Sequence, residues 1–242
     1  RCLYEIDEEE FEKQMGYLST HGFSAVSLED YLTGNRGQEN SKGQTVILTF
    51  DDGHRSNFEV CLPILLKFGF RATFFIIVGS IGLPNFLTWE QLREMQKQGM
   101  SIQPHGITHR FLTSLDKAEK LYELGKSKAI LEEKLNRPIL HFSLPGGRYD
   151  RDCLALAASV GYRAVCTSKT GLNAHLYPPF LVERIAVKRT FSLDTFSKIL
   201  KGRWSTLFRL KSQQFLLDMA KWGLGDSRYE SLRKTLLNNL GC

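Results

Sequence analysis

The sequence lacks the long apolar segments that mark membrane-spanning or secreted chains. Among its 242 residues no run of about 18 apolar residues occurs, so we expect no transmembrane helix. The first residues, "RCLYEIDEEEFEK", are charged and contain no apolar stretch of the kind found in a signal peptide, so we expect none in the printed sequence. The sequence also begins abruptly, which is consistent with a fragment of a longer product.

Cysteine is scarce and scattered along the chain. The cysteines are odd in number and form no C-x-x-C pair, which argues against a disulfide framework and against a cysteine zinc site. This usage favours a reducing compartment. The five residues are Cys2, Cys61, Cys153, Cys166 and Cys242.

The composition is that of an ordinary globular protein. Hydrophobic residues make up 42% and charged residues 24% of the chain, which excludes a disordered or fibrous class. The length suits one large domain, or one domain with an appendage. The net charge of +6 allows attraction to anionic polymers or membrane surfaces, and much of it lies in the last 60 residues. No recognition motif accompanies this charge, so nucleic acid is a poor candidate partner.

Strand-like and helix-like segments alternate from about residue 23 to residue 200. This alternation predicts an α/β fold with a mostly parallel sheet and crossover helices. Six or seven strands are expected, which fits a closed or nearly closed β/α barrel better than a short open sheet. We therefore predict a barrel domain over residues 1–202 and a basic, amphipathic helical tail over residues 203–242. The predicted strands cover residues 23–27, 45–50, 71–79, 100–104, 139–144, 162–168 and 181–189, and the predicted helices cover residues 8–22, 27–34, 58–69, 88–99, 114–136, 151–161 and 192–202.

Unusual residues follow three successive strands of this pattern. Because the carboxyl ends of parallel strands meet at one edge, we expect the three groups to lie on one rim, where α/β proteins bind ligands. The groups are Asp51 and Asp52 after residues 46–50, His105 and His109 after residues 101–104, and the Pro145-Gly146-Gly147 turn after residues 139–144.

The two histidines and the aspartate pair favour a metal site. His105 and His109 are four residues apart and can face the same way on a helical turn, where two neutral imidazoles and a carboxylate can bind zinc or another divalent ion. The alternative is that one histidine caps a helix and the other is solvated. The aspartate pair on a neighbouring strand end makes the metal site the better interpretation.

Adjacent carboxylates such as Asp51 and Asp52 do not both ionise readily unless a cation lies between them or one holds a proton. A metal beside one of them would resolve this repulsion. The second carboxylate could then take a proton from metal-bound water, which is the arrangement of metal-assisted hydrolysis. The alternative is a simple Asp-Gly turn.

The ordered motifs "TFDDG", "HGITH" and "FSLPGGRYD" resemble those of the polysaccharide deacetylase family (NodB homology, carbohydrate esterase family 4). The connecting segments "CLPILLKFGFRATFFIIVGSIG" and "LTWEQLREMQKQGMSI" are also similar, and the resemblance covers roughly residues 8 to 200. It implies a distorted (β/α)7-type barrel with a C-terminal helical appendage. It also implies a hydrolase that removes N- or O-linked acetyl groups from a polysaccharide or oligosaccharide.

The resemblance implies a role for each residue of the first two motifs. Asp51 matches the catalytic base of the family, which would deprotonate the attacking water. The cofactor would be one divalent metal ion, usually zinc, which would bind the water and the acetyl carbonyl oxygen. Its ligands would be Asp52, His105 and His109.

The third motif, which begins at Pro145, is implied to contact the oxyanion and the substrate. The tetrahedral oxyanion would be held by the metal and by a backbone N–H near Gly147 or Arg148. The products would be acetate and a free amine or hydroxyl on the sugar.

Three departures from the family pattern stand out. Gly106 stands where the family usually has a serine or threonine hydroxyl that fixes the loop, and Ser143 stands where an arginine often pairs with the base. Arg148 is a candidate to supply that charge. The segment "VERIAVKR" lacks the histidine that serves as general acid in many members, and His175 in the preceding loop is the nearest candidate. The strand that usually precedes "EEEFEKQM" is absent from the printed sequence.

These departures leave two alternatives to a plain enzyme. One is a degenerate, non-catalytic member that binds a glycan without turning it over. The other adds a partner: the basic tail would dock on a membrane surface or on a polysaccharide-assembly protein. The family favours an extracytoplasmic or membrane-associated location, whereas the cysteines and the absent signal favour the cytoplasm. The sequence does not specify the sugar polymer or the type of acetyl linkage.

Overall fold

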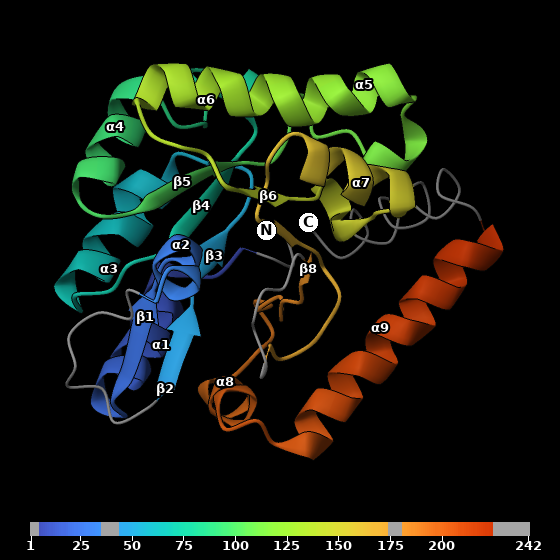
Figure 1. Cartoon of the computed structure of the whole chain (residues 1–242). Coiled ribbons are helices and arrows are strands. Elements are labelled where there is room, and N and C mark those ends of the chain that lie inside the picture. Colours follow the sequence, from blue (N-terminus) through green and yellow to red (C-terminus); the bar gives the residue numbers. More distant parts are fainter. Residues whose placement is uncertain (1–4, 35–43, 174–180, 225–242) are drawn as a thin grey trace. The chain divides into compact units, whose positions relative to one another are not determined.

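The computed structural model describes residues 5–34, 44–173 and 181–224 (Figure 1). The chain divides into two compact units, which are described separately. The first contains residues up to Gln14, Lys169–Leu172 and the chain from Glu183 onward, and the second contains Met15–Ser168 and Asn173–Val182. The division into a barrel domain of residues 1–202 and a tail of residues 203–242 stays a prediction.

The strands of the second unit are parallel wherever they pair, which confirms the α/β class. The side chain of Gln103 accepts hydrogen bonds from the backbone N–H groups of Leu140 and His141, so it links the second sheet to the third. Closure of the strands into a barrel stays a prediction. The sheets are β1(Phe23–Val26) with β2(Gln44–Ile47); β3(Thr49–Phe50), β4(Thr73–Ile76) and β5(Ser101–Pro104); and β6(His141–Ser143), β7(Ala164–Cys166) and β8(Leu181–Val182).

Helices alternate with strands along the chain, as the sequence predicted. In the second unit the helices lie on the outer side of the strands (Figure 1). Their starts carry the expected caps: Thr88 and Gln91 form a capping box, and the side chain of Ser27 accepts from the N–H of Asp30. The helices are α1(Glu8–Thr20), α2(Leu28–Leu32), a π-helical turn at Asn57–Cys61 leading into α3(Leu62–Lys67), α4(Trp89–Lys97), α5(Lys117–Leu121), α6(Ser127–Leu135), α7(Arg151–Ser159), α8(Leu193–Leu200) and α9(Trp204–Leu224).

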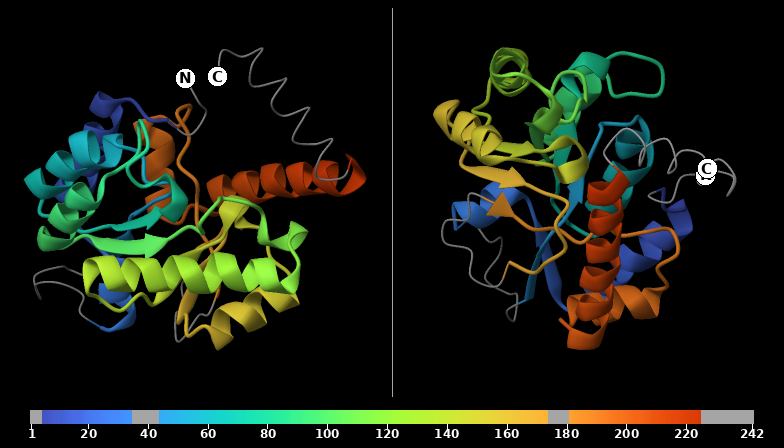
Figure 2. Two further views of the ribbon diagram at one scale, coloured as in Figure 1. Left: turned by 90° about the horizontal axis from the view of Figure 1, so that it is seen from above. Right: turned by 90° about the vertical axis from the view of Figure 1, so that its right-hand side faces the viewer.

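The long helix predicted over residues 114–136 forms as one rod (Figure 2). Helices α5 and α6 are joined without a break by a π-helical turn at Tyr122–Lys126. This wider turn places Glu123 and Leu124 on the buried side of the rod. Such turns are frequent at functional sites.

The core of the second unit lies between the strands. Phe74, Phe75 and Phe142 are fully buried, and every residue of β4 is buried. A parallel strand that is covered on both faces is expected to be mostly apolar, and β4 has Phe74, Phe75 and Ile76 after the buried Thr73. Burying each of these phenylalanine side chains stabilises the fold by roughly 1.5–3 kcal/mol.

The strand predicted over residues 181–189 is wrong beyond its first two residues. Only Leu181–Val182 pairs with β7. The strand ends at Val182, and the next two residues contact the segment that follows β7: Glu183 forms an ion pair with Lys169 at 3.4 Å, and the N–H of Arg184 donates to the Lys169 carbonyl at 3.0 Å. Charged side chains at 183, 184 and 188 give this segment little to bury in a parallel sheet.

The tail begins as one helix, α9, which packs against α8. The rest of the predicted helical tail, beyond Leu224, lies outside the described residues. Within the described part of the chain, no helix is both long enough and apolar enough to cross a membrane.

Candidate active site

A tight turn follows β3 and carries the aspartate pair. Asp52 and Gly53 both have left-handed backbone conformations, with φ of 73° and 78°. A Cβ on Gly53 would lie 3.0 Å from the side chain of Ile76, so only glycine fits there without displacement. The Asp52 carbonyl accepts from Ile77 N–H at 3.3 Å, which ties the turn to the end of β4. The Asp-Gly turn that was considered as the alternative is therefore present, and it carries the candidate site.

The two histidines lie on a loop after β5. The helical turn considered for them is wrong: residues 105–109 form no helix, and Gly106 and His109 have φ of 82° and 61°. His105 N–H donates to the Ile76 carbonyl at 2.8 Å, so it continues the pairing of β5 with β4. The left-handed backbone at His109 is uncommon outside glycine, and the surrounding contacts must hold it.

Asp52, His105 and His109 converge as the sequence predicted. Asp52 Oδ1 lies 3.6 Å from His105 Nε2 and 3.4 Å from His109 Nε2. One ligand atom from each residue lies within 4.8 Å of the others. Asp52 Oδ1 is buried and has no hydrogen-bond partner among the described residues. A buried carboxylate oxygen facing two imidazole nitrogens is a donor set that fits a divalent metal ion.

The surroundings of His105 leave its Nε2 available to bind such an ion. Its side chain is only 3% exposed. Nδ1 lies 2.7 Å from the Ser143 carbonyl, so Nδ1–H donates to that oxygen and Nε2 keeps its lone pair. Burial lowers the pKa of His105, against the opposing effect of Asp51 and Asp52, which favours the neutral imidazole that metals require.

Asp51 faces the same centre but is placed differently from Asp52. Its Oδ2 lies 3.9 Å from His105 Nε2 and accepts a hydrogen bond from Ser143 Oγ at 3.3 Å. About a third of its side chain is exposed, so water can reach it. Ser143, which stands in place of the arginine of the family pattern, thus contacts the base candidate directly. A hydroxyl bonded to a carboxylate orients it without adding charge.

The third motif forms a short 3-10 turn at Pro145–Gly147. A Cβ on Gly106 would lie 3.8 Å from the Pro145 ring, which places this turn beside the histidine loop. Gly147 has φ of 69°, and a Cβ on it would lie 2.2 Å from the Ser168 backbone nitrogen. The Gly147 N–H donates to the Leu144 carbonyl at 2.7 Å, so it is engaged within the turn.

The remaining candidates have different outcomes. The Arg148 guanidinium stacks over the ring of Phe111 at 4.2 Å. His175, the candidate general acid, lies outside the described residues.

Sequence reasoning missed Glu123, which is 2% exposed and bonds the histidine loop. No local pattern signals it, because Lys120 and Ser127, which share its buried face, are polar as well.

Comparison with known proteins finds similar deacetylases. The Bacillus subtilis (strain 168) protein YxkH is 29% identical over 197 residues, which are 81% of this chain and 71% of that protein. The poly-beta-1,6-N-acetyl-D-glucosamine N-deacetylase of Staphylococcus aureus (strain MRSA252) is 26% identical over 215 residues, which are 83% of this chain and 72% of that protein.

A solved structure is also similar. The Streptococcus pyogenes deacetylase PplD, in complex with acetate, matches with a TM-score of 0.74 and 28% identity, over 81% of this chain and 87% of that one. The family model for polysaccharide deacetylases matches residues 38–165, more than half of the chain, including all three site motifs. The chain therefore belongs to the polysaccharide deacetylase family.

Proposed function

We propose that this polysaccharide deacetylase is a metal-dependent hydrolase that uses one water molecule to cleave an acetyl group from a sugar. The observation that carries the proposal is the buried Asp52 Oδ1, which lies within 4 Å of both His105 Nε2 and His109 Nε2. Three protein ligands with an open fourth position are typical of catalytic zinc sites. One carboxylate and two imidazoles suit zinc, so we propose zinc as the ion.

Asp52, His105 and His109 would hold the ion. When bound, it would supply Lewis-acid chemistry, polarising the acetyl carbonyl and making the attacking water more acidic. Asp51 would take the proton from that water, because its carboxylate is accessible and is oriented by the Ser143 hydroxyl. Neighbouring aspartates would thus have separate roles.

We propose that the backbone N–H of Arg148 helps to hold the oxyanion that forms when water attacks the acetyl carbon. The Gly147 N–H is already engaged with Leu144, which supports Arg148 over Gly147. Pro145 would shape the turn that presents this N–H. Cleavage of the C–N or C–O bond requires a proton on the leaving atom, and we propose that His175 delivers it.

We propose a polymer of N-acetylated sugar as the substrate. The support is the name of the Staphylococcus aureus relative, a poly-beta-1,6-N-acetyl-D-glucosamine N-deacetylase. The acetate bound to the similar Streptococcus pyogenes deacetylase is the expected product of such a reaction. O-acetylated glycans would enter the same chemistry, so substrate tests should include both linkages.

The test combines metal content with acetate release from N-acetylglucosamine oligomers. Asp51→Asn is expected to abolish turnover while the metal stays bound, because Asp51 lies outside the ligand set. His105→Ala or His109→Ala is expected to lose the metal. A purified protein that carried no stoichiometric divalent ion and gained no activity with added Zn²⁺ would refute the proposal.

A second candidate function is glycan binding without turnover. The absence of a histidine from residues 181–189 favours it, because the family's usual general acid is missing there. Acetate release separates the two functions. A metal-loaded protein that bound acetylated oligosaccharide and released no acetate from N- or O-linked substrates would be the binding protein.

We also propose that α9 docks on an anionic membrane surface, which would give the enzyme a membrane-associated location. Its exposed apolar side chains recur at helical spacing, and no acidic residue occurs from 201 to 217. Aromatic and basic side chains together are typical of helices that lie in the lipid interface. The apolar residues are Trp204, Phe208, Phe215 and Met219, and the exposed basic residues nearby are Lys201, Arg203, Arg209 and Lys211.

Vesicle sedimentation tests this docking. The protein is expected to bind phosphatidylglycerol vesicles and to bind phosphatidylcholine vesicles less. The double variant Trp204→Ser/Phe208→Ser should lose this binding, whereas Leu83→Ser, which removes an exposed apolar side chain elsewhere, should not. Equal binding by the wild type and the double variant would refute the docking.

A further inference from the structure

We propose that Glu123 is a positioning residue that fixes the loop joining the two metal-ligand histidines. The inference rests on the proposed metal-dependent function and deepens it, because it assigns the shape of the metal site to a residue outside the three motifs. Glu123 lies in the π-helical turn between α5 and α6 and is 2% exposed.

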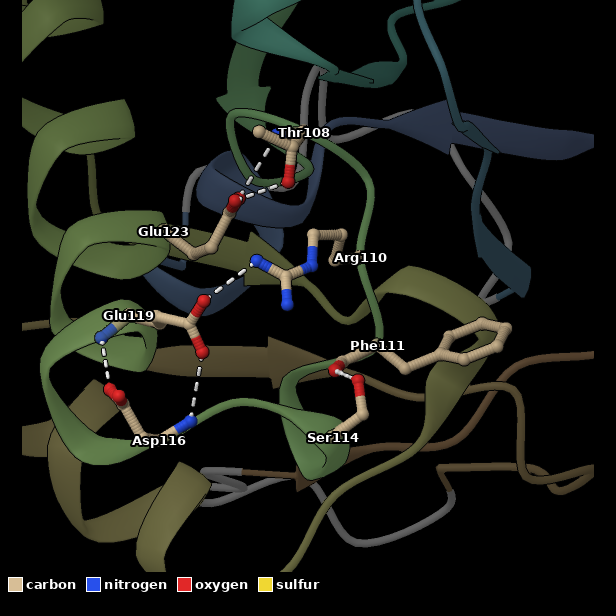
Figure 3. Close-up of polar contacts among 7 residues, drawn as sticks. All are labelled: Thr108, Arg110, Phe111, Ser114, Asp116, Glu119 and Glu123. Carbon is tan, nitrogen blue, oxygen red and sulfur yellow. Dashed lines mark hydrogen bonds and ion pairs between the residues drawn. The ribbon is translucent and has the colours of Figure 1, made fainter. Parts of the chain in front are cut away.

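The carboxylate of Glu123 is directed entirely at this loop (Figure 3). Its Oε2 accepts hydrogen bonds from Ile107 N–H at 2.6 Å and from Thr108 N–H at 3.1 Å. Its Oε1 accepts from the Thr108 hydroxyl. Three donors from two successive residues thus meet one buried carboxylate, midway between His105 and His109. Hydrogen bonds to a charged group are stronger than those between neutral groups.

Gly106 makes room for this contact. A Cβ at position 106 would lie 2.8 Å from Glu123 Oε2, and the backbone there has φ of 82°. The serine or threonine that the family usually has at this position would therefore crowd the carboxylate. With glycine in place, no hydroxyl at 106 is present to fix the loop, and Glu123 bonds it at the next two residues instead.

The π-helical turn helps to position the Glu123 carboxylate. The π-helical turn begins next to Glu123, and the buried Ser127 hydroxyl donates to the Glu123 carbonyl. That bond supplies a partner to a backbone carbonyl at the wide turn, where the regular helical pattern is interrupted. The arrangement holds a charged side chain inside the fold, where it would be costly unless its acceptors were used.

The loop needs such a contact because His109 is held in an unfavourable conformation. Its φ of 61° lies in the left-handed region, which is uncommon for a residue other than glycine. In this conformation its Nε2 lies 3.4 Å from Asp52 Oδ1. If the Glu123 bonds were lost, the loop would relax and His109 would sample positions away from Asp52.

The test compares four variants in metal affinity and in amide hydrogen exchange of the metal-free protein. Glu123→Leu removes all three bonds and is expected to weaken Zn²⁺ binding about 10- to 100-fold, as losses of outer metal contacts do. It should also speed exchange at Ile107 and Thr108. Glu123→Gln keeps an oxygen for the two N–H donors, so its Zn²⁺ affinity should fall by less than about tenfold. Thr108→Val removes the hydroxyl bond, so its Zn²⁺ affinity and its amide exchange should both lie between those of the wild type and those of Glu123→Leu.

Glu119→Gln is the matched control. Glu119 lies one helical turn earlier, caps α5 through the Asp116 N–H and pairs with Arg110 at 2.8 Å (Figure 3). It is a hydrogen-bonded carboxylate on the same rod, but among the described residues its side chain bonds Arg110 and Asp116 and neither Ile107 nor Thr108. Its loss should leave metal affinity and the exchange of both amides unchanged.

Each outcome decides the inference. Wild-type metal affinity and wild-type amide exchange in folded Glu123→Leu would overturn it. If that variant fails to fold by circular dichroism, Glu123→Gln and Thr108→Val carry the test, and unchanged exchange in both would overturn it. If the wild type binds no metal, the proposed function fails, and amide exchange alone still decides whether Glu123 fixes the loop.

Discussion

Lowering the pH should destabilise the protein through His141, a histidine that the proposed chemistry does not use. His141 begins β6 and is 1% exposed, and neither ring nitrogen has a hydrogen-bond partner among the described residues. Burial, assisted by the positive charges of Arg163 and Lys128, lowers its pKa from 6.5 to about 4. The unfolded chain therefore takes up a proton at a pH where the folded chain does not.

The direction and size of the change in stability follow from the difference between the pKa of His141 in the folded chain and in the unfolded chain. Because the folded pKa is the lower one, the stabilisation from neutral His141 is complete above pH 6.5 and is lost as the pH falls towards 4. At about 1.4 kcal/mol per pH unit, the loss reaches about 2 kcal/mol at pH 5 and about 3 kcal/mol in total.

Urea unfolding of the metal-free protein at pH 7.5 and pH 5 measures the effect, with His141→Leu as the control. Other groups titrate equally in both proteins, so the difference between their two pH-dependent losses isolates His141. The wild type should lose about 2 kcal/mol more free energy of unfolding than His141→Leu. Equal losses in the two proteins would show that the reasoning about burial is wrong.

Three further changes test the site and its support. Ser143→Ala should lower kcat/KM for acetate release about five- to tenfold, because it removes the long hydroxyl bond to Asp51. Its Zn²⁺ affinity should not change, because the carbonyl that binds His105 remains, and a parallel loss of metal would contradict the assignment. Gly147→Ala should lower the free energy of unfolding by about 1–3 kcal/mol in urea titrations, because the new Cβ meets the Ser168 backbone at positive φ; an unchanged midpoint would refute this. Asp150→Ala should cost more than the roughly 1 kcal/mol of a lost helix cap by the same measurement, because Asp150 both caps α7 through the Cys153 N–H and pairs with the buried Lys120 at 2.9 Å, whereas Asp150→Asn should restore only the cap; equal stability of Asp150→Ala and Asp150→Asn would refute this.

The rim of the site could be predicted from the sequence, because it depends on strand order alone. Parallel strands end on one edge, so residues placed directly after three strands had to meet there. Asp52, His105 and His109 follow this rule, and their convergence is confirmed. Caps such as Thr88 with Gln91 were predictable for a similar reason, since a capping box is specified within four residues.

The loop geometry could not be predicted, because it depends on contacts between distant segments. Nothing local indicates that His109 adopts a left-handed conformation, since Glu123, fourteen residues later, helps to hold the loop. Lys169 and Glu183, which pair just beyond the end of the strand at Val182, are likewise far apart in the sequence. Side-chain bonds across 14 residues or more are invisible to local patterns of hydrophobicity.

Ser143 explains how two adjacent aspartates can have different roles. Its carbonyl accepts from His105 Nδ1–H, which turns Nε2 towards Asp52, and its hydroxyl donates to Asp51 Oδ2. One residue at the end of β6 therefore orients both a metal ligand and the proposed base. The left-handed backbone at Asp52 lets its carboxylate face the histidines while the preceding carboxylate faces Ser143. A substitution at Ser143 that disturbed only the hydroxyl should affect proton transfer, whereas one that moved the carbonyl should affect metal binding as well. The proposed difference in role between the aspartates thus depends on β6, a strand to which neither aspartate belongs.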